Sequence, residues 1–245
     1  MTSLVIVAAV AMIAGVLIGM TGVGGVLLVP ALTEWVAVPL DRAIAASMLA
    51  FLCAGTFATV LHLRMAPVPR THALPLALTA CAGAIAGASS VAFIAPQVVR
   101  VFIAALALFS GLHALVSAAP RAEGALPAPR TLAALGVLVG YGSALSGTGG
   151  PVLLLPVLLA LGTPARRAVA LALVVQVPVS LSATVIHAVA GRIDYGLAAL
   201  LSALLLVGIL SGTAASRRLS SAGLKRVVAV MLVVVGAWYA VVSLA

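Results

Sequence analysis

The chain alternates long apolar blocks with short polar connectors. The blocks are Leu4–Val38, Ala43–Leu63, Ala73–Ile94, Val98–Ala118, Leu132–Leu161, Ala168–Ala190, Leu197–Ala215 and Val227–Leu244. A helix that crosses a bilayer needs about 20 mostly apolar residues, and nearly every charge lies in the connectors. The pattern therefore predicts an all-α, polytopic membrane protein.

A shift of 125 residues superimposes similar residues from the two halves of the chain. The matches include charged residues, polar residues and glycines. They are Gly15 with Gly140, Arg42 with Arg167, Thr59 with Thr184, His62 with His187, Gly83 with Gly208, and Gly87 with Gly212. Because recurrence at a fixed shift indicates a repeat, we expect two homologous repeats of transmembrane helices. The first is residues 1–118 and the second is residues 131–245, with a proline-rich linker at 119–130.

The first apolar block of each repeat is too long for one crossing and is interrupted by glycines. The matched glycines are Gly22, Gly24 and Gly25, and then Gly147, Gly149 and Gly150, after which Pro151 follows. Glycine in a helix interior costs roughly 1 kcal/mol relative to alanine. We therefore expect each block to form two shorter helices that meet at a glycine elbow. We name Thr21–Gly25 the first elbow and Ser146–Gly150 the second elbow.

Composition agrees with a surface that faces lipid. The chain is 64% hydrophobic and 7% charged, whereas soluble domains are about 25% charged. The net charge of +9 comes from bases in short connectors, which is typical of the cytoplasmic flanks of membrane helices. We therefore expect the lipid bilayer, and no nucleic acid, as a partner.

The positions of the bases also indicate the topology. If each first block turns back at its elbow, Arg42, Arg100 and Arg192 fall on one side of the membrane. The bases on the other side are then Arg64, Arg70, Arg121, Arg130, Arg166, Arg167, Arg217, Arg218, Lys225 and Arg226. This division is more uneven than that given by eight plain crossings, so cytoplasmic enrichment of Lys and Arg favours it. The repeats are then inverted with respect to each other, and both termini are extracytoplasmic.

The elbows are candidates for binding an anion. A broken helix frees backbone N–H groups at the start of the next helix, and these groups carry partial positive charge. Such groups are tolerated at membrane depth only inside protein or in a wet cavity. The hydroxyls of Thr21, Ser146 and Thr148 would add donors. The candidate site is thus Thr21, Gly22, Gly24, Gly25, Ser146, Gly147, Thr148, Gly149 and Gly150. The alternative is close helix packing by small residues, which fully explains Gly83, Gly87, Gly208 and Gly212.

Other polar residues leave alternatives open. Gln176 is an amide deep in an apolar block, so it bonds either a neighbouring helix or the substrate. Its match in the first repeat is Phe51. His62 and His187 are candidates for proton coupling or for contact with headgroups at the membrane interface. Arg42 and Arg167 could gate or steer an anion, or could anchor helices at the membrane edge.

Several classes of chemistry are not indicated. The sequence has no nucleophile-elbow motif, no P-loop, and no acid deep in an apolar block. The two cysteines, Cys53 and Cys81, lie in apolar blocks and resemble small buried hydrophobic residues rather than metal ligands. We expect a protein that is not an enzyme and has no metal or cofactor.

The duplicated motif resembles the TauE/SafE family of sulfite exporters and organosulfonate permeases. The resemblance rests on Gly19–Gly25 with Pro30, on Ser146–Pro151 with Pro156, and on Arg42-Ala43 with Arg167-Ala168. It implies a permease for sulfite, a sulfonate or a related small oxyanion in the cytoplasmic membrane of a bacterium, with the elbows binding the substrate. Together with the repeats it favours alternating access. A passive anion channel and a membrane scaffold are the alternatives, and a homodimer stays open.

Overall fold

The computed structural model describes residues 2–116, 125–216, 230, 233–234 and 236–242. The elements are α1 (Thr2–Thr21), η1 (Gly25–Leu27), α2 (Leu28–Trp35), α3 (Leu40–Met65), α4 (Arg70–Ser90), α5 (Pro96–Val116), α6 (Pro129–Ser146), α7 (Pro151–Ala160), α8 (Ala165–Val189) and α9 (Tyr195–Ser216). Among these residues, five helices are long and apolar enough to cross a membrane. The prediction of a polytopic helical membrane protein is therefore confirmed.

Prolines mark where many of the helices begin. A proline has no backbone N–H, and its fixed φ angle suits the first turn of a helix. Helices α3, α4 and α8 start directly after Pro39, Pro69 and Pro164, while α5, α6 and α7 start with Pro96, Pro129 and Pro151. The expected linker at 119–130 ends inside α6, and its part up to residue 124 lies outside the described residues.

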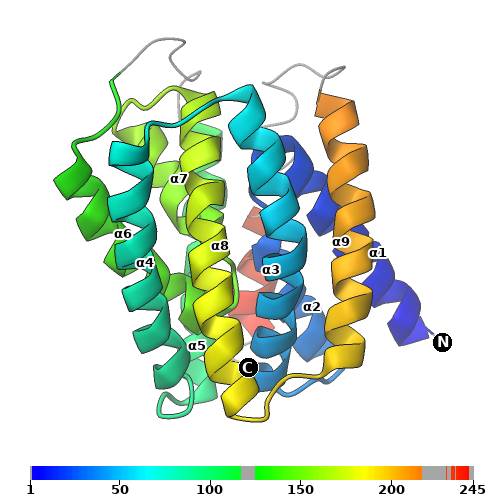
Figure 1. The fold of residues 1–245 in the computed structure, drawn as a ribbon. Coiled ribbons are helices and arrows are strands. Elements are labelled where there is room, and N and C mark those ends of the chain that lie inside the picture. The colour runs from blue at the N-terminus through cyan, green and yellow to red at the C-terminus, as the bar shows by residue number, and fades with distance from the viewer. Residues whose placement is uncertain (1, 117–124, 217–229, 231–232, 235, 243–245) are drawn as a thin grey trace.

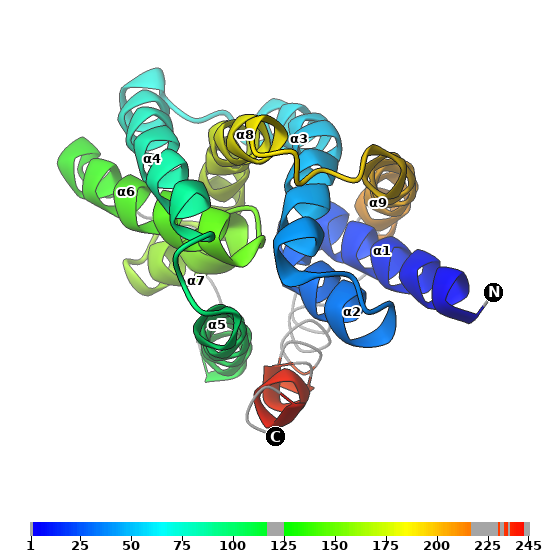
Figure 2. The ribbon, with the colours of Figure 1, turned by 90° about the horizontal axis from the view of Figure 1, so that it is seen from below.

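Two helix pairs pack through glycines. Helix α1 lies along α9, and α4 lies along α6 (Figure 2). A methyl group added at Gly212 would lie 2.1 Å from the Val16 carbonyl oxygen, and one added at Gly140 would lie 2.1 Å from the Ala80 carbonyl oxygen. Backbone therefore contacts backbone at both crossings, as expected for small-residue faces. Each pair combines helices from both halves, so the two halves are interleaved rather than packed as separate bodies.

Helices α3 and α8 contact each other between these two pairs. The Thr59 hydroxyl of α3 donates a hydrogen bond to the Leu173 carbonyl of α8 at 2.8 Å, and Gly55 faces Gln176. Helices α3 and α8 are therefore antiparallel. The pairs α1–α9 and α4–α6 are parallel. Gly15 faces Leu205 while Gly19 faces Ile209, and Gly83 faces Val137 while Gly87 faces Tyr141. Of the helices related by the 125-residue shift, α3 and α8 therefore run antiparallel to each other.

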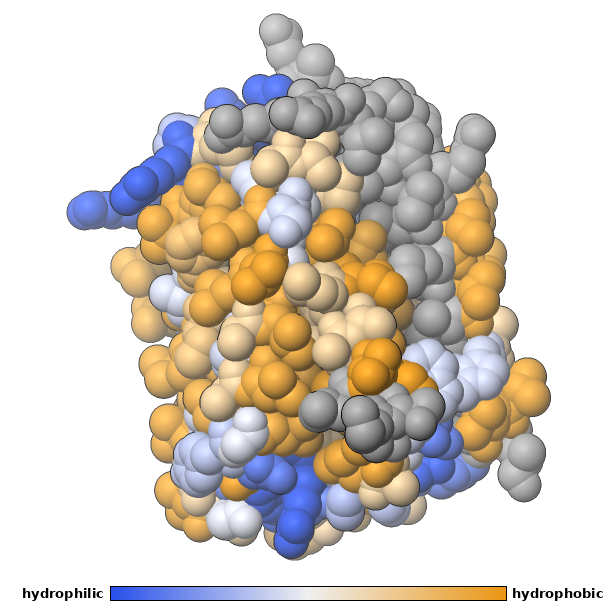
Figure 3. Space-filling view, turned by 90° about the vertical axis from the view of Figure 1, so that its right-hand side faces the viewer, coloured by the Kyte–Doolittle hydropathy of each residue, from blue (hydrophilic) through white to orange (hydrophobic). Residues whose placement is uncertain are grey.

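The connections fall into two groups at opposite ends of the bundle (Figure 1). The segments 36–39, 91–95 and 190–194 lie at the lower end, and the segments 66–69 and 161–164 lie at the upper end. On the face shown in Figure 3, the most hydrophilic residues gather near the two ends, with a mainly hydrophobic band between them. The described bases thus divide as the charge pattern predicts, while Arg121, Arg217, Arg218, Lys225 and Arg226 lie outside the described residues.

Candidate anion site at the glycine elbows

The first elbow breaks the helix after Thr21. Gly22 has a positive φ of 77°, and its N–H still donates to the Ile18 carbonyl at 2.8 Å. The Thr21 hydroxyl donates to the Leu17 carbonyl at 2.9 Å and accepts from the Val23 N–H at 3.3 Å. Gly24 is extended, and the chain then passes through η1 into α2. The break lies where the glycines predict it.

The second elbow uses more left-handed backbone. Gly147, Gly149 and Gly150 have φ angles of 72°, 83° and 112°, which glycine adopts readily and other residues do not. The Ser146 hydroxyl donates to the Gly142 carbonyl at 2.7 Å and lies 2.9 Å from the Thr148 hydroxyl. Helix α7 then begins at Pro151, so this break also lies at the predicted position.

The two elbows contact each other inside the bundle. A methyl group added at Gly25 would lie 2.6 Å from the Thr148 carbonyl oxygen and 2.8 Å from the Phe51 ring. Gly22 packs against Val169 of α8 and Gly147 against Ile44 of α3, and these two contacts are related by the 125-residue shift. All the elbow residues are buried except Thr21, which is partly exposed. The structure thus brings together the candidate residues from the two halves.

Phe51 of α3 and Gln176 of α8 flank the second elbow. A methyl group at Gly149 would lie 3.1 Å from Phe51 Cδ2 and 3.6 Å from Gln176 Nε2. Phe51 is 0% exposed and Gln176 is 2% exposed, and Gln176 Oε1 has no hydrogen-bond partner in the described chain. An unsatisfied polar atom in the interior is rare and calls for an explanation. Because Oε1 is an acceptor, a water or a donor group of a ligand would supply one, and an anion would not.

Four backbone donors at the elbows are also unpaired. The N–H groups of Gly24, Gly25, Gly149 and Gly150 make no hydrogen bond within the part of the chain that the structure describes. Buried N–H groups almost always find a partner in protein or in ordered water. By contrast, the hydroxyls of Thr21 and Ser146 donate to carbonyls of their own helices. The glycine N–H groups are therefore the donors left for an anion, while the hydroxyls hold the shape of the elbows.

The candidates for gating and coupling lie toward the helix ends. Arg42 and Arg167 are exposed in the first turns of α3 and α8. His62 and His187 are 8% and 0% exposed in the last turns of the same helices, which argues against contact with headgroups. His62 Nδ1 lies 3.0 Å from the Ala58 carbonyl, whereas neither ring nitrogen of His187 has a partner among the described residues.

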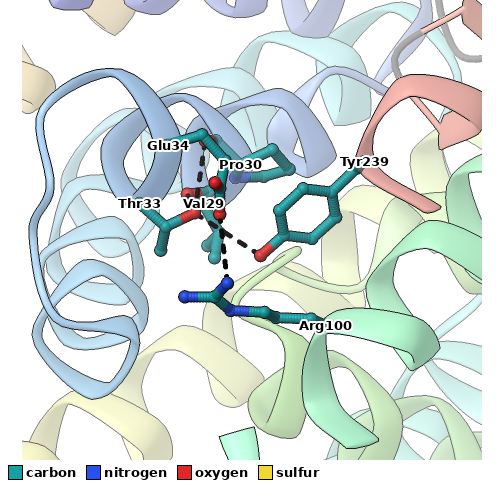
Figure 4. A network of polar contacts seen from close by, with 6 residues as sticks. All are labelled: Val29, Pro30, Thr33, Glu34, Arg100 and Tyr239. Atoms are coloured by element: carbon teal, nitrogen blue, oxygen red, sulfur yellow. Dashed lines mark hydrogen bonds and ion pairs between the residues drawn. The ribbon is translucent and has the colours of Figure 1, made fainter. Parts of the chain in front are cut away.

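The first elbow's hairpin is anchored at its far end (Figure 4). The Glu34 carboxylate of α2 lies 3.5 Å from the Arg100 guanidinium of α5. The Thr33 hydroxyl lies 3.4 Å from the Tyr239 hydroxyl, and the rings of Trp35 and Trp238 are 5.2 Å apart. These contacts join α2 to α5 and to the helical segment 236–242. Sequence reasoning did not identify them, because nothing in the pattern pairs Glu34 with a base far away in the chain.

Sequence reasoning also passed over Phe51 as part of the site. The residue matches Gln176 under the 125-residue shift, and that match was the signal that could have found it. In the described residues, no group of three or more His, Cys, Asp or Glu side chains is placed to hold a metal ion.

Comparison with known proteins gives one match. The model of the family described as "Sulfite exporter TauE/SafE" matches residues 7–239, nearly the whole chain. Searches of curated proteins and of solved structures find no match.

Proposed function

Because the chain belongs to the sulfite exporter TauE/SafE family, whose members are membrane transporters, we propose that it moves a small oxyanion across the membrane by alternating access. The substrate binds where the two elbows meet. We propose further that the membrane is the cytoplasmic membrane of a bacterium, with the upper end in Figure 1 in the cytoplasm, since most of the described bases lie there.

The observation that carries this proposal is the group of unpaired N–H donors of Gly24, Gly25, Gly149 and Gly150, whose residues are buried in the bundle. N–H groups at a helix break carry partial positive charge and bind anions. They come from both halves of the chain, so one anion between the elbows would contact both halves at once. A rocking motion of the α1–α9 pair against the α4–α6 pair could then expose the site to either side.

The broken helices support transport over the scaffold alternative. A scaffold that binds partner helices needs no broken helices, and a continuous first helix would favour it. Instead, α1 ends at Thr21 and α6 ends at Ser146, with a turn at each elbow. His187, buried and unpartnered in the described chain, is a candidate to carry a coupled proton.

The proposal is tested by measuring anion flux into liposomes that contain the purified protein. Gly24→Leu and Gly149→Leu should each abolish flux while the protein remains in the membrane, because the new side chains would occupy the elbows. Gly196→Leu is the matched control, since Gly196 is exposed at the start of α9 and its nearest neighbouring atom is 3.4 Å from an added methyl group. Normal flux in both elbow variants would refute the proposal.

The same liposomes distinguish a transporter from a passive channel. A coupled transporter accumulates the anion against its own gradient when a proton gradient or membrane potential is applied. A channel for the same anion only lets it equilibrate with the applied potential, so a proton gradient alone produces no accumulation.

A further inference from the structure

One face of α8 carries a line of polar residues between the second elbow and the lower end of the bundle. The residues are Gln176, Ser180, Thr184 and His187. Residues three or four apart lie on the same side of a helix, and the line is about 16 Å long at 1.5 Å per residue. It therefore covers about half of a hydrocarbon core that is roughly 30 Å thick, and it ends beside the connection 190–194 (Figure 1).

Every residue of this line has a buried polar atom without a hydrogen-bond partner in the described chain. These atoms are Gln176 Oε1, Ser180 Oγ, Thr184 Oγ1 and both ring nitrogens of His187. Gln176, Ser180 and His187 are 2%, 0% and 0% exposed. Unsatisfied polar atoms are costly inside a membrane protein. Several of them on one helix face indicate a shared partner, and ordered water is the usual partner of buried polar groups.

Other hydroxyls on the same two central helices are bonded. Ser182 of α8 and Thr59 of α3 each donate to the carbonyl four residues earlier in their own helix, at 2.7 Å. This local bond is common for Ser and Thr in helices. The hydroxyls of Ser180 and Thr184 make no such bond within the described structure. They are therefore able both to donate to water and to accept from it.

Helix α3 supplies a further hydroxyl at the level of Thr184. Gly55 faces Gln176, and α3 and α8 are antiparallel. Ser47 and Thr184 are each eight residues from that contact toward the lower end, so the equal rise of the two helices places them at one height. The Ser47 hydroxyl is buried and has no partner among the described residues. Polar groups on two helices thus surround the same stretch of the bundle.

Among the described residues, α3 has no equivalent line in the upper half of the bundle. The 125-residue shift matches Gln176, Ser180, Thr184 and His187 with Phe51, Gly55, Thr59 and His62. Phe51 and Gly55 have no polar side-chain atom, and the Thr59 hydroxyl is bonded. His62 Nδ1 lies 3.0 Å from the Ala58 carbonyl oxygen. The line therefore connects the elbows with the lower end alone.

His187 lies at the lower end of the line, near charged groups that reach solvent. Asp41, in the first turn of α3, and Arg192, in the connection after α8, are partly exposed and act electrostatically on the ring. The other helices packed on α8 are α4, α6 and α7. Their charged residues and histidine are Arg70, Arg130 and His72, which lie in first turns at the upper end. The ring is therefore placed to exchange a proton with the lower side.

We propose that the polar face of α8 holds a file of ordered water that carries the coupled proton between the lower end and the second elbow. His187 takes up a proton on one ring nitrogen and releases the proton of the other nitrogen to the first water, so the ring becomes neutral again. The Thr184 and Ser180 hydroxyls each accept one proton and release another. Gln176 Oε1 accepts a hydrogen bond from the last water, beside the glycine N–H groups. Proton and oxyanion then lie side by side and cross together.

This inference rests on the proposed function. It goes beyond it by assigning the coupled ion as a proton, by naming the route of that proton, and by giving Gln176 Oε1 the donor that an anion cannot supply. A singly charged anion that crosses with one proton moves no net charge. A pH gradient should therefore drive transport, and a membrane potential alone should not.

The test uses liposomes that contain the wild-type protein or a variant, with a pH-sensitive dye inside. The probes are sulfite and ethanesulfonate, and protein-free liposomes give the leak. Ethanesulfonate stays ionised throughout, so protons that move with it must pass through the protein. In the wild type, a pH gradient should drive accumulation of the anion, and anion entry should change the internal pH.

Variants assign the coupling to the line on α8. The double variant Ser180→Ala, Thr184→Val and the single variant His187→Gln should lose the response to the pH gradient. Their anion flux should instead follow the membrane potential, because the anion crosses without its proton. Ser182→Ala is the matched control and should behave as the wild type, since this hydroxyl is bonded to its own helix and lies 3.0 Å from Cys81 Sγ.

Thermal unfolding of the purified protein tests the bound water separately from transport. Replacing a hydroxyl that has no partner in a dry interior removes a desolvation penalty, whereas replacing one that binds water breaks its hydrogen bonds. Thr184→Val keeps the shape of the side chain and should lower the midpoint of unfolding. A raised midpoint would show that the hydroxyl binds no water and would overturn the inference.

The outcomes separate this inference from the proposed function. If wild-type anion flux carries no protons, or if the double variant keeps its response to the pH gradient, the inference is wrong and anion transport stands. Should the double variant fail to fold, His187→Gln and the two single hydroxyl variants decide in the same way. If neither probe crosses the membrane with the wild-type protein, the inference and the proposed function fail together.

Discussion

The glycines at the helix crossings differ from the glycines of the elbows. Gly140 and Gly212 lie inside helices, where an added methyl group would meet the backbone of a neighbouring helix at 2.1 Å. Gly149 and Gly150 have positive φ angles, and added methyl groups would meet side chains at 3.1 Å and 3.3 Å. Crossing glycines therefore bring helices together, whereas Gly149 and Gly150 shape the backbone of the second elbow and leave their own N–H groups unpaired.

The two kinds of glycine also differ in how closely they follow the repeat. The α1–α9 and α4–α6 crossings are built alike. The elbows are not, because Gly149 has a φ of 83° while its match, Gly24, has a φ of −179°. The packing of the bundle thus follows the repeat, and the candidate site departs from it. Four sets of substitutions test this contrast, in order of decreasing effect on stability.

The largest effect is expected at the crossings. Gly140→Ala and Gly212→Ala should each lower the free energy of unfolding by about 3 kcal/mol, because the helices must separate to admit the methyl group. Thermal and denaturant unfolding of the purified protein would measure the loss. Gly196→Ala is the control and should be neutral or slightly stabilising, since alanine favours the helix. Equal stability of Gly140→Ala and Gly196→Ala would contradict the role assigned to the crossings.

A smaller loss of stability, but a large loss of transport, is expected at the second elbow. Gly150→Ala places a side chain at a φ of 112°, and a left-handed conformation costs about 1–2 kcal/mol for a non-glycine residue. Anion flux should fall by more than about tenfold, because a shift of the N–H donors weakens electrostatic stabilisation of the anion.

The control for backbone strain is Gly191→Ala. Gly191 also has a positive φ, of 66°, and an added methyl group there meets no atom within 4 Å. The variant should lose similar stability and keep its flux. If Gly150→Ala and Gly191→Ala transported equally well, the elbow would have no special role in transport.

The hydroxyls of the second elbow should have a modest effect. Ser146→Ala and Thr148→Val each remove part of the bonded pair and should cost about 1 kcal/mol. The double variant should cost less than the sum, because the two hydroxyls share one hydrogen bond. The free energies of unfolding of the wild type, the two single variants and the double variant together give the coupling energy between the two hydroxyls. Strictly additive losses would mean that the pair does not form.

The sequence predicted the helices and their packing better than the candidate site. Apolar blocks, prolines and glycines act locally, so they located the helices, the breaks after Thr21 and Ser146, and the packing faces on α4 and α9. The division of the basic residues indicated that the two repeats are inverted. It did not show that α1 would pack on α9 rather than on helices of its own half, because that choice depends on contacts across the whole bundle.

The chemistry within the site depends on three-dimensional detail that composition does not encode. The pattern predicts Ser146 as a donor to an anion, and the structure adds that its hydroxyl donates to the Gly142 carbonyl of its own helix. Local side-chain to backbone bonding of this kind is common for Ser and Thr in helices. The Phe51 ring was missed for the opposite reason, since an apolar residue in an apolar block carries no local signal of function.

The smallest effect is expected at the anchor of the first hairpin, where Glu34 pairs with Arg100 at 3.5 Å. The second hairpin has no such pair, because Leu159 and Ala160 stand at the matching end of α7. The Glu34 and Arg100 side chains are 16% and 32% exposed, so the pair is partly screened by solvent. Glu34→Gln should cost no more than about 1 kcal/mol, and high salt should narrow the difference from the wild type.

Charge reversal separates a specific pair from general charge effects at this end of the bundle. Glu34→Arg and Arg100→Glu should each reduce stability, because each single change places like charges together. The combined exchange should recover most of the loss, since opposite charges again face each other across α2 and α5. If the double variant were no more stable than either single one, α2 would be held by the contacts of Thr33 and Trp35 instead. The anchor of the first hairpin would then be hydrogen-bonded and aromatic rather than ionic.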